Sequence, residues 1–362
     1  MRRLRAIGLM SGTSMDGVDA ALLETDGDTI FAFGPVASLS YDEDFRNRLR
    51  TIVGHPPDDS AETASIIRQL TEIHADVVRM LLENAGMAAT DINLLGFHGQ
   101  TVFHAPHDGV TYQVGDAALL AELTGIDTIA DFRSRDMAAG GEGAPFAPVY
   151  HVALSRPLER PLAVLNIGGV ANVTWISPDG GALAFDTGPG NALVDDWVKS
   201  RTGATRDQDG KLARRGDVAD ALLEPLMENP YFAKPVPKSL DRDAFDDALS
   251  KLQELSDADG AATLTAFTAR TIAKATDHFP APPLRWLVTG GGRHNPALMA
   301  ALRRELALPV EPVEAVGWDG DALEAQAFAF LAARSLFAMP LSFPQTTGVS
   351  KPVSGGRLFE AP

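Results

Sequence analysis

Three segments of the chain combine glycines with small polar or acidic residues. Residues 12–17 read Gly-Thr-Ser-Met-Asp-Gly, residues 186–190 read Asp-Thr-Gly-Pro-Gly, and residues 290–292 are all glycine. Glycines let a backbone approach a ligand closely, and N–H groups together with hydroxyls suit a phosphate group. Each segment alone is a common kind of turn. Together they indicate two phosphate-holding turns and a glycine loop that lies against a nucleoside.

The first segment differs from the Walker A phosphate loop, because it contains no lysine and does not open a helix. Taken alone, it fits an ordinary polar hairpin tip equally well. A nucleotide site built from two such turns and a glycine loop is the arrangement of the actin, Hsp70 and sugar-kinase superfamily.

The three segments follow predicted strands. Apolar runs at residues 7–11 and 18–23 flank the first one and predict a β-hairpin. Further strands are expected at residues 92–97, 127–131, 162–167, 170–176, 183–186 and 286–289. One helix is expected from a capping box of Asp59 and Glu62 to a stop at Gly86. Others are expected from Asn191 as N-cap, over residues 264–272, from Asn295, and over residues 321–336. Strands that alternate with helices predict an α/β fold.

The composition changes at a glycine-rich segment, residues 139–143. We therefore expect an N-terminal α/β domain over residues 1–135 and a C-terminal α/β domain over residues 136–362. Both halves open with a strand–turn–strand pattern that carries glycines and an acid, which is the trace that a duplicated fold leaves. In such α/β folds ligands gather at strand ends, so an interdomain active-site cleft is expected.

Composition limits the kinds of molecule that the chain is expected to bind. The chain has 362 residues, 45% of them hydrophobic, no cysteine and a net charge of −17. That charge argues against nucleic acid, whose phosphates need a basic surface. No apolar run approaches the ~20 residues that span a bilayer, and no signal peptide is recognised, so a cytoplasmic protein is expected. The sequence leaves the oligomeric state open, with a homodimer as one expectation.

Six motifs occur in a fixed order along nearly the whole chain. They are Gly-Thr-Ser-Met-Asp-Gly-Val-Asp at 12–19, His-Gly-Gln-Thr at 98–101, Asp-Phe-Arg at 131–133 with Gly-Gly-Glu-Gly-Ala-Pro at 140–145, Asn-Ile-Gly-Gly-Val-Ala-Asn at 166–172, Phe-Asp-Thr-Gly-Pro-Gly-Asn at 185–191, and Val-Thr-Gly-Gly-Gly at 288–292. This set resembles the anhydro-N-acetylmuramic acid kinase family of bacterial cell-wall recycling. The resemblance implies a two-domain actin-like ATPase (ribonuclease H-like) fold.

The resemblance also implies a reaction. Water opens the internal bridge of 1,6-anhydro-N-acetylmuramic acid while O6 receives the γ-phosphoryl group of ATP, giving N-acetylmuramic acid 6-phosphate and ADP. Asp186 is then the candidate base for water, because a carboxylate in a glycine turn can reach a substrate. The alternative is that Asp186 caps the turn or holds Mg²⁺ through water.

The residues expected to bind ATP follow from the same motifs. They are Gly12, Thr13, Ser14, Met15, Asp16, Gly17, Val18, Asp19, Asn166, Gly168, Gly188, Gly290, Gly291 and Gly292. Asp16 is also a candidate Mg²⁺ ligand through water, since that ion keeps several waters. A purely structural role for Asp19 is equally compatible with its place beyond the turn.

The residues expected on the sugar side are His98, Gln100, Thr101, Asp131, Arg133 and Glu324. Arg133 suits the lactyl carboxylate of the substrate, because a guanidinium binds carboxylates in a bidentate way. Asp131 would orient that arginine, bind a hydroxyl or form a surface ion pair. Glu324 has capping-box spacing from Asp321, so a helix start explains it as well as a sugar contact does.

Other functions stay open at this stage. Another sugar or acyl kinase of the superfamily would carry the same phosphate elements. A non-enzymatic, ATP-driven interaction protein like actin or Hsp70 would need a large partner-binding segment, and none is visible in the sequence. A glycosidase would use two acids, one of which would be Asp186, but this function leaves the three glycine segments unexplained.

Overall fold

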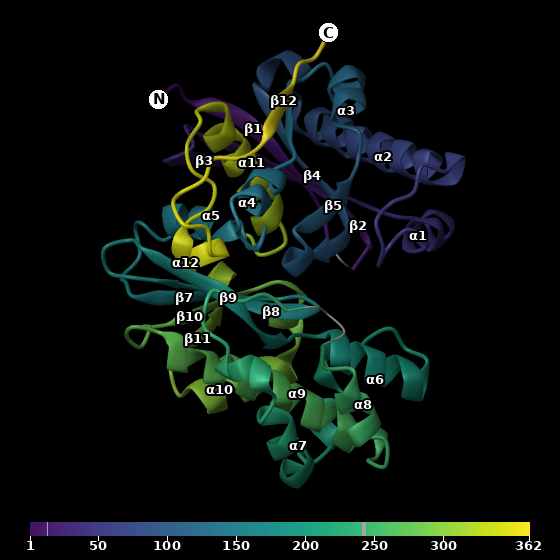
Figure 1. Ribbon diagram of the computed structural model, residues 1–362, viewed down its shortest axis with the longest axis vertical. Coiled ribbons are helices and arrows are strands. Elements are labelled where there is room, and N and C mark those ends of the chain that lie inside the picture. The colour runs from purple at the N-terminus through teal and green to yellow at the C-terminus, as the bar shows by residue number, and fades with distance from the viewer. Residues whose placement is uncertain (13, 241–243) are drawn as a thin grey trace. The chain divides into compact units, whose positions relative to one another are not determined.

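The computed structural model describes residues 1–12, 14–240 and 244–362. These residues form two compact units: Met1–Leu154 together with Ala322–Pro362, and Ser155–Asp321 (Figure 1). The domain boundary expected between residues 135 and 136 therefore falls inside the first unit, and the last part of the chain returns to that unit. A change in composition marks the glycine-rich segment, but it does not show which sheet a distant helix will cover.

The first unit contains a mixed sheet in the order β12-β6-β4-β1-β2-β3, with β5 paired to β4. Strand β1 pairs antiparallel with β2 and parallel with β4. The strands are β1 (Leu4–Ser11), β2 (Gly17–Thr25), β3 (Ile30–Ser40), β4 (Leu94–Ala105), β5 (Val110–Val114), β6 (Thr128–Ala130) and β12 (Arg357–Phe359). The helices are α1 (Glu43–Arg50), α2 (Ala61–Ala85), α3 (Ala117–Thr124), α4 (Ser134–Ala138), α5 (Ala147–Leu154), α11 (Leu323–Leu336) and α12 (Pro344–Thr347).

Helices α2 and α11 cover opposite faces of this sheet (Figure 1). Ile7 and Leu9 of β1 join the core that α2 completes. Gly8 points the other way, because side chains alternate along a strand. A Cβ on Gly8 would lie 1.8 Å from the Ala325 carbonyl oxygen of α11, and one on the neighbouring Gly96 would lie 2.2 Å from that of Phe328. The two glycines thus let α11 lie directly on the sheet.

The second unit repeats this plan with the order β11-β10-β7-β8-β9. Its strands are β7 (Leu162–Ile167), β8 (Val170–Ile176), β9 (Ala182–Pro189), β10 (Trp286–Thr289) and β11 (Val310–Pro312). Its helices are α6 (Ala192–Thr202), α7 (Asp220–Met227), α8 (Asp247–Lys251), α9 (Asp257–Lys274) and α10 (Pro296–Leu306). One core lies between the sheet and helices α9 and α10, and a second lies among α6, α7, α8 and α9.

Helix starts depart from expectation in two places. Helix α2 ends at Gly86 in the left-handed conformation as predicted, but its N-cap is Ser60, whose hydroxyl accepts from the Thr63 N–H, and not Asp59. Helix α11 begins at Leu323 without any side-chain cap. Asp321 and Glu324 therefore form no capping box, and a helix cap does not explain Glu324.

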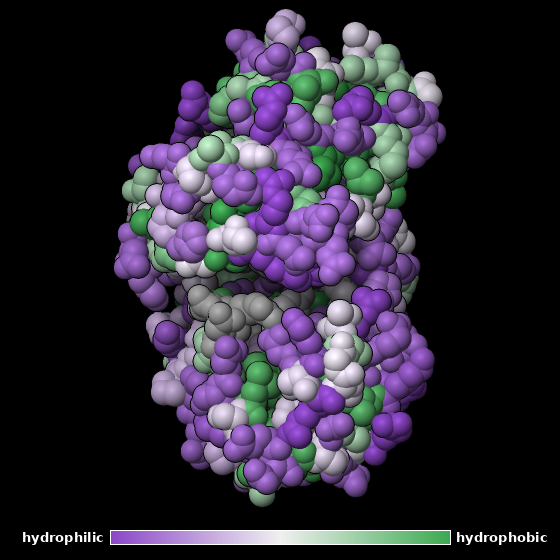
Figure 2. Space-filling model, turned by 90° about the vertical axis from the view of Figure 1, so that its right-hand side faces the viewer, coloured by the Kyte–Doolittle hydropathy of each residue, from purple (hydrophilic) through white to green (hydrophobic). Residues whose placement is uncertain are grey.

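The surface is mainly polar. Most residues on the face drawn in Figure 2 are hydrophilic, and the hydrophobic ones form small groups. The edge strand β3 exposes Phe31, Phe33 and Val36. Within the described part of the chain, no helix is both long enough and apolar enough to cross a membrane.

Candidate active site

The expected phosphate turn of the first unit joins β1 to β2. The Met15 N–H donates to the Gly12 carbonyl (3.1 Å), and Met15 has a positive φ of 51°. The Ser14 hydroxyl donates to the Asp16 carboxylate (2.8 Å). Among the described residues, a Cβ on Gly12 would meet the Ser14 hydroxyl at 3.6 Å, an ordinary contact distance. A side chain at Gly12 would thus clash with none of the described residues, and Thr13, also expected here, lies outside them.

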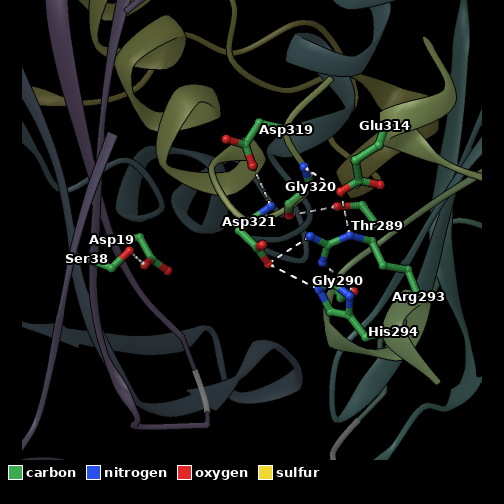
Figure 3. Close-up of polar contacts among 10 residues, drawn as sticks. All are labelled: Asp19, Ser38, Thr289, Gly290, Arg293, His294, Glu314, Asp319, Gly320 and Asp321. Carbon is green, nitrogen blue, oxygen red and sulfur yellow. Dashed lines mark hydrogen bonds and ion pairs between the residues drawn. The ribbon is translucent and has the colours of Figure 1, made fainter. Parts of the chain in front are cut away.

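The next three expected ATP residues belong to strand β2. A Cβ on Gly17 would lie 2.4 Å from the Leu39 carbonyl oxygen, so this glycine admits the neighbouring strand β3. Val18 is 1% exposed in the hydrophobic core. The Asp19 carboxylate accepts from the Ser38 hydroxyl of β3 (2.6 Å), as Figure 3 shows. Gly17 and Val18 thus serve the packing of the sheet, and Asp19 Oδ1 contacts a neighbouring strand.

A buried chain of hydrogen bonds ties the turn to strand β4. The Ser11 hydroxyl donates to Gln100 Oε1 (2.6 Å) and lies 2.7 Å from the Tyr41 hydroxyl. Because Ser11 has one proton, Tyr41 must donate to Ser11. Burial raises the pKa of Tyr41, so the donor keeps its proton. Gln100, expected on the sugar side, therefore anchors the phosphate turn with its carbonyl oxygen.

An arginine that sequence reasoning missed also reaches the turn. Arg46 Nη2 of helix α1 donates to the Ser14 carbonyl (3.2 Å). The Arg46 Nε atom is buried and has no hydrogen-bond partner among the described residues. Thirty-two residues separate the two contacting groups along the chain, so no local motif marks the contact. The turn contains no lysine, but it does have a nearby cation.

His98 and Arg133 form the polar centre of the first unit's remaining site residues. His98 is 5% exposed, and its Nδ1 lies 2.8 Å from the Gly99 carbonyl oxygen. A carbonyl only accepts, so Nδ1 carries the proton and Nε2 accepts from Arg133 Nε (3.2 Å) and Nη2 (2.8 Å). Burial and the Arg133 charge hold the pKa of His98 well below its usual value. His98 is therefore a neutral side chain that orients the guanidinium.

The Arg133 guanidinium also donates from Nη1 to the Gly143 carbonyl (2.7 Å). Burial lowers the pKa of Arg133 to about 10, while the charges of Glu324 and Asp136 oppose that shift. Asp136 in turn accepts from the Gly143 N–H (2.7 Å). Three of the five N–H groups of the arginine are used, which leaves one on each terminal nitrogen for a ligand.

The sugar-side candidates other than Arg133 lie in β4, at residue 131 and in α11. His98, Gln100 and Thr101 lie within β4 and not after a strand ending at residue 97, because Gly99 adopts a φ of 71° and β5 extends the pairing. Asp131 is exposed, has a φ of 56° and accepts from the Ser134 hydroxyl. Glu324 is exposed in the first turn of α11.

Asp186, the candidate base, lies in β9 of the second unit and is half-buried. Its Oδ2 accepts from the Leu240 N–H (2.8 Å), its N–H donates to the Lys238 carbonyl (3.0 Å), and its own carbonyl accepts from the Tyr231 hydroxyl (2.7 Å). The sequence suggested a strand that ends at Asp186, whereas β9 continues to Pro189. The carboxylate is thus held from a strand and from a separate segment.

A row of polar residues crosses the sheet of the second unit. In the strand registers Thr289 lies opposite Asn166, Asn166 opposite Asn172, and Asn172 opposite Asp186. Directly opposed side chains share a face and lie roughly 5 Å apart at Cβ. The sheet therefore aligns two predicted site residues, Asn166 and Asp186, with the residue that precedes Gly290.

The glycine loop at residues 290–292 is fixed by charged neighbours (Figure 3). Arg293 Nη1 donates to the Gly290 carbonyl (3.0 Å), while its Nε and Nη2 pair with Glu314 (2.9 Å) and Asp321 (2.8 Å). The arginine side chain is 3% exposed, and burial acts to lower its pKa, but these two carboxylates raise it. Arg293 thus holds the loop to the end of the second unit at Asp321.

The glycines of the second unit have different surroundings. A Cβ on Gly290 would lie 2.3 Å from Asn166 Oδ1, and one on Gly188 would lie 2.7 Å from the Thr271 hydroxyl. A Cβ on Gly292 would meet Ile167 at 2.6 Å. By contrast, the nearest atoms to a Cβ on Gly168 or Gly291 would be 3.7 and 4.0 Å away. A Cβ therefore fits at Gly168 and at Gly291 without a clash.

The described residues contain no group of three or more histidines and carboxylates that could hold a metal ion. Magnesium needs less than that from a protein, because it keeps waters and binds substrate phosphates. The Asp16 carboxylate, beside an open turn and hydrogen-bonded to Ser14, is compatible with such a contact through water.

The repeated strand order and the helices on both sheets define a two-domain actin-like ATPase, a class of α/β protein. The crystal structure of (R)-2-hydroxyglutaryl-CoA dehydratase component A from Acidaminococcus fermentans supports this fold. It matches with a TM-score of 0.50 and 13% identity, over 91% of this chain and 98% of that one.

The sequence profile of anhydro-N-acetylmuramic acid kinase matches residues 4–361. Curated relatives of that name from Rhodospirillum rubrum and Acidiphilium cryptum are 56% and 55% identical to this chain. The matches cover 98% of this chain in both cases, and 94% and 98% of the relatives. The chain therefore belongs to the anhydro-N-acetylmuramic acid kinase family and is a kinase, a phosphotransferase that uses ATP.

Proposed function

We propose that this chain opens 1,6-anhydro-N-acetylmuramic acid with water and phosphorylates the freed O6 with ATP, as part of cell-wall recycling. In this reaction the C1–O6 bond breaks, the water oxygen bonds to C1, and O6 takes the γ-phosphoryl group while ADP leaves. One proton must leave the attacking water. The observation that best supports the proposal is Asp186, a half-buried carboxylate whose Oδ2 is held by the Leu240 N–H, in a chain of this family.

Asp186 would take that proton. Its Oδ2 is fixed by the Leu240 N–H (2.8 Å), and both of its backbone groups are hydrogen-bonded to residues 231 and 238. A base fixed in this way keeps its orientation toward a bound water, and general-base catalysis typically contributes about 10²–10⁴ in rate. The main alternative role, anchoring Mg²⁺ through water, predicts a loss of nucleotide affinity instead.

The two units would supply different groups for the triphosphate and the nucleoside. In the first unit the open turn at Gly12, with Ser14 and Asp16, suits phosphate oxygens and a hydrated Mg²⁺. In the second unit Gly168 and Gly291 are uncrowded, and Asn166 lies against the Gly290 loop. Bound Mg²⁺ would neutralise phosphate charge.

Arg133 would bind the lactyl carboxylate of the sugar. Its two remaining terminal N–H groups, one on Nη1 and one on Nη2, match the two oxygens of a carboxylate. His98 and Gly143 hold the guanidinium in one orientation. Glu324, whose charge acts on Arg133, would accept from a sugar hydroxyl or amide.

The test is a product analysis with the full chain, the anhydro-sugar, MgATP and oxygen-18-labelled water. The expected product is N-acetylmuramic acid 6-phosphate with the label at C1 and none in the phosphate. Phosphorylated sugar with an intact bridge, or bridge opening without ATP, would overturn the mechanism. Equal or faster turnover of another sugar or acyl acceptor would assign the chain a different substrate.

We also propose a homodimer and a cytoplasmic location. Measurements of molecular size in solution test the homodimer, and cell fractionation tests the location.

A further inference from the structure

Lys238 is an unusual lysine, because its side chain is buried. The residue is 8% exposed, whereas Lys234, four positions earlier, is exposed. The Lys238 ammonium donates to the carbonyls of Tyr231 (3.0 Å) and Phe232 (3.1 Å) and lies 3.3 Å from His278 Nε2. The two carbonyls thus occupy two of the three N–H donors of the ammonium group, and His278 Nε2 also lies 3.3 Å from the Phe232 carbonyl oxygen.

The segment that contains Lys238 also supplies the described hydrogen bonds to Asp186. Tyr231 at its start donates through its hydroxyl to the Asp186 carbonyl, and Leu240 at its end donates to the Asp186 carboxylate. Between them, the Lys238 carbonyl accepts from the Asp186 N–H. The Lys238 ammonium, near the end of this segment, is hydrogen-bonded to residues 231 and 232 at its start, and so ties together the parts that contact Asp186.

Burial disfavours the positive charge of the Lys238 ammonium. Among the described residues Lys238 forms no ion pair with a carboxylate, and the charged groups that act on it, Lys234 and Lys274, are both positive. The rings of Tyr231 and Phe185 lie 4.7 and 5.8 Å from its nitrogen. Burial lowers the pKa of Lys238 to about 8, and the two lysines add to that effect.

A methionine would fill similar space without this desolvation penalty, since buried lysines are rare unless paired. Stability alone therefore does not account for a lysine here. What the ammonium provides is directional: N–H donors for the Tyr231 and Phe232 carbonyls that an apolar side chain lacks.

We propose that Lys238 is a positioning residue for Asp186. By holding the carbonyls of Tyr231 and Phe232 it fixes the segment whose Leu240 N–H orients the carboxylate. The inference rests on the proposed role of Asp186 as the base. Lys238 itself touches neither substrate nor reacting atoms in this assignment.

The test compares Lys238→Met with Lys234→Met, a matched loss of an exposed lysine from the same segment. In Lys238→Met, kcat should fall about 10- to 100-fold, since a small misplacement of a reacting group has effects of that order. The KM values for ATP and sugar should stay within about two-fold, because the binding groups are untouched. The acid limb of the kcat–pH profile should move to higher pH, because a carboxylate that loses a hydrogen-bond donor takes up a proton more readily.

The Asp186→Asn background separates positioning from general structural damage. There, Lys238→Met should lower the residual rate less than about two-fold, because the base that it orients is already absent. A merely structural lysine would lower the rate equally in both backgrounds, and that result would overturn the proposal. A kcat for Lys238→Met within about two-fold of that for Lys234→Met would also overturn the proposal.

Two further outcomes are distinguishable. If Asp186→Asn keeps normal turnover, the proposed base is wrong and the positioning role falls with it. If Asp186→Asn is inactive while Lys238→Met is normal, only the positioning role is wrong. Should Lys238→Met fail to fold, Lys238→Gln, which keeps two N–H donors on a neutral group, replaces it under the same criteria.

Discussion

The first unit has the strand order β3-β2-β1-β4-β6 and the second has β9-β8-β7-β10-β11. In both, the first strand of the unit pairs antiparallel with the second and parallel with the fourth. The hairpin connections differ: residues 12–16 join β1 to β2, whereas two glycines, 168 and 169, join β7 to β8. The longer connection carries hydroxyls and an acid, so the first unit has side chains where the second has only backbone.

The two units also place their acids differently on equivalent strands. In the first, Asp19 on the second strand lies opposite Ser38 on the third and accepts its hydroxyl. In the second, Asn172 takes the place on the second strand, and the acid, Asp186, lies on the third. A hydroxyl within the sheet holds Asp19, whereas a segment outside the sheet holds Asp186. Equivalent strands thus hold their acids with different kinds of partner: a side chain of the sheet for Asp19, and a backbone N–H from outside it for Asp186.

The largest effect that this comparison predicts is at Asp186. Asp186→Asn keeps the shape of the side chain and an acceptor for the Leu240 N–H, but it loses the capacity to take a proton. Turnover should fall by about 10²–10⁴, with little change in the affinities for sugar and ATP. Calorimetry and single-turnover kinetics together check this prediction.

Asp19→Asn is the comparison variant. Its amide oxygen can still accept from Ser38, so we expect a smaller loss of turnover than in Asp186→Asn, and any effect should appear in ATP affinity. Near-normal turnover in Asp186→Asn would remove the base role. A joint loss of nucleotide affinity and rate would favour Mg²⁺ anchoring by Asp186.

Arg133 of the first unit and Arg293 of the second should affect different substrates. Arg133 orients toward the sugar-side groups of the first unit, and Arg293 fixes the glycine loop of the second. A lysine keeps the charge but cannot reproduce either set of contacts. Charged hydrogen bonds are worth about 1.5–3 kcal/mol, so each affinity should fall roughly 10- to 100-fold. Arg133→Lys should raise KM for sugar and Arg293→Lys KM for ATP; equal effects of either variant on both substrates would contradict the division.

Glycines sharpen the comparison further. A Cβ on Gly12 or Gly291 would lie 3.6 or 4.0 Å from its nearest described neighbour, so alanine there should leave the free energy of unfolding nearly unchanged and weaken ATP binding. Gly17 and Gly290 would place a Cβ 2.4 and 2.3 Å from neighbouring oxygens, so alanine there should destabilise the fold itself. The expected loss is about 1–3 kcal/mol for strain or overpacking. Urea denaturation and ATP titration of all four variants test the assignment, and normal ATP binding by Gly12→Ala would exclude close approach at that turn.

Local patterns predicted the elements best where a short buried strand ends in glycine or a polar turn. Strands β7, β8 and β10 have the predicted bounds, since apolar runs and flanking glycines specify them without help from the rest of the chain. Gly86 ends α2 because its φ of 63° suits glycine. By contrast, β4 extends past residue 97 because β5 pairs with it, which no pattern within β4 reveals.

Long-range contacts account for what the sequence did not predict. The return of α11 to the first unit depends on Gly8 and Gly96, more than two hundred residues upstream of it. Asp321 fails to cap α11 because it pairs with Arg293. Arg46 and Lys238 have no local signature, since their partners lie elsewhere in the chain or in backbone carbonyls. The motifs predicted which residue types gather at strand ends, but not which of them are used within the sheet, as Val18 and Gln100 are.

The last prediction concerns how the units bury titratable groups: the first unit buries His74 in its core, whereas the second buries Lys238. His74 Nδ1 donates to the Leu70 carbonyl (2.8 Å), and its Nε2 is buried without a hydrogen-bond partner among the described residues. Burial lowers the pKa of His74 to about 4. Protonation would place a charge where no acceptor lies.

Proton linkage gives the direction in which stability changes with pH. Between about pH 6.5 and pH 4 the unfolded chain binds a proton at His74 that the folded chain does not, so the free energy of unfolding falls as pH falls. Relative to His74→Leu, the wild type should lose on the order of 3 kcal/mol across that range. Between about pH 7 and pH 8 the difference in free energy of unfolding between the two proteins should stay constant, because the histidine is neutral in both the folded and the unfolded state. Urea denaturation of both proteins near pH 7 and near pH 5 measures it. A difference that does not change with pH would mean that the folded protein accommodates the protonated ring, and that this core is less closed to charge than its packing indicates.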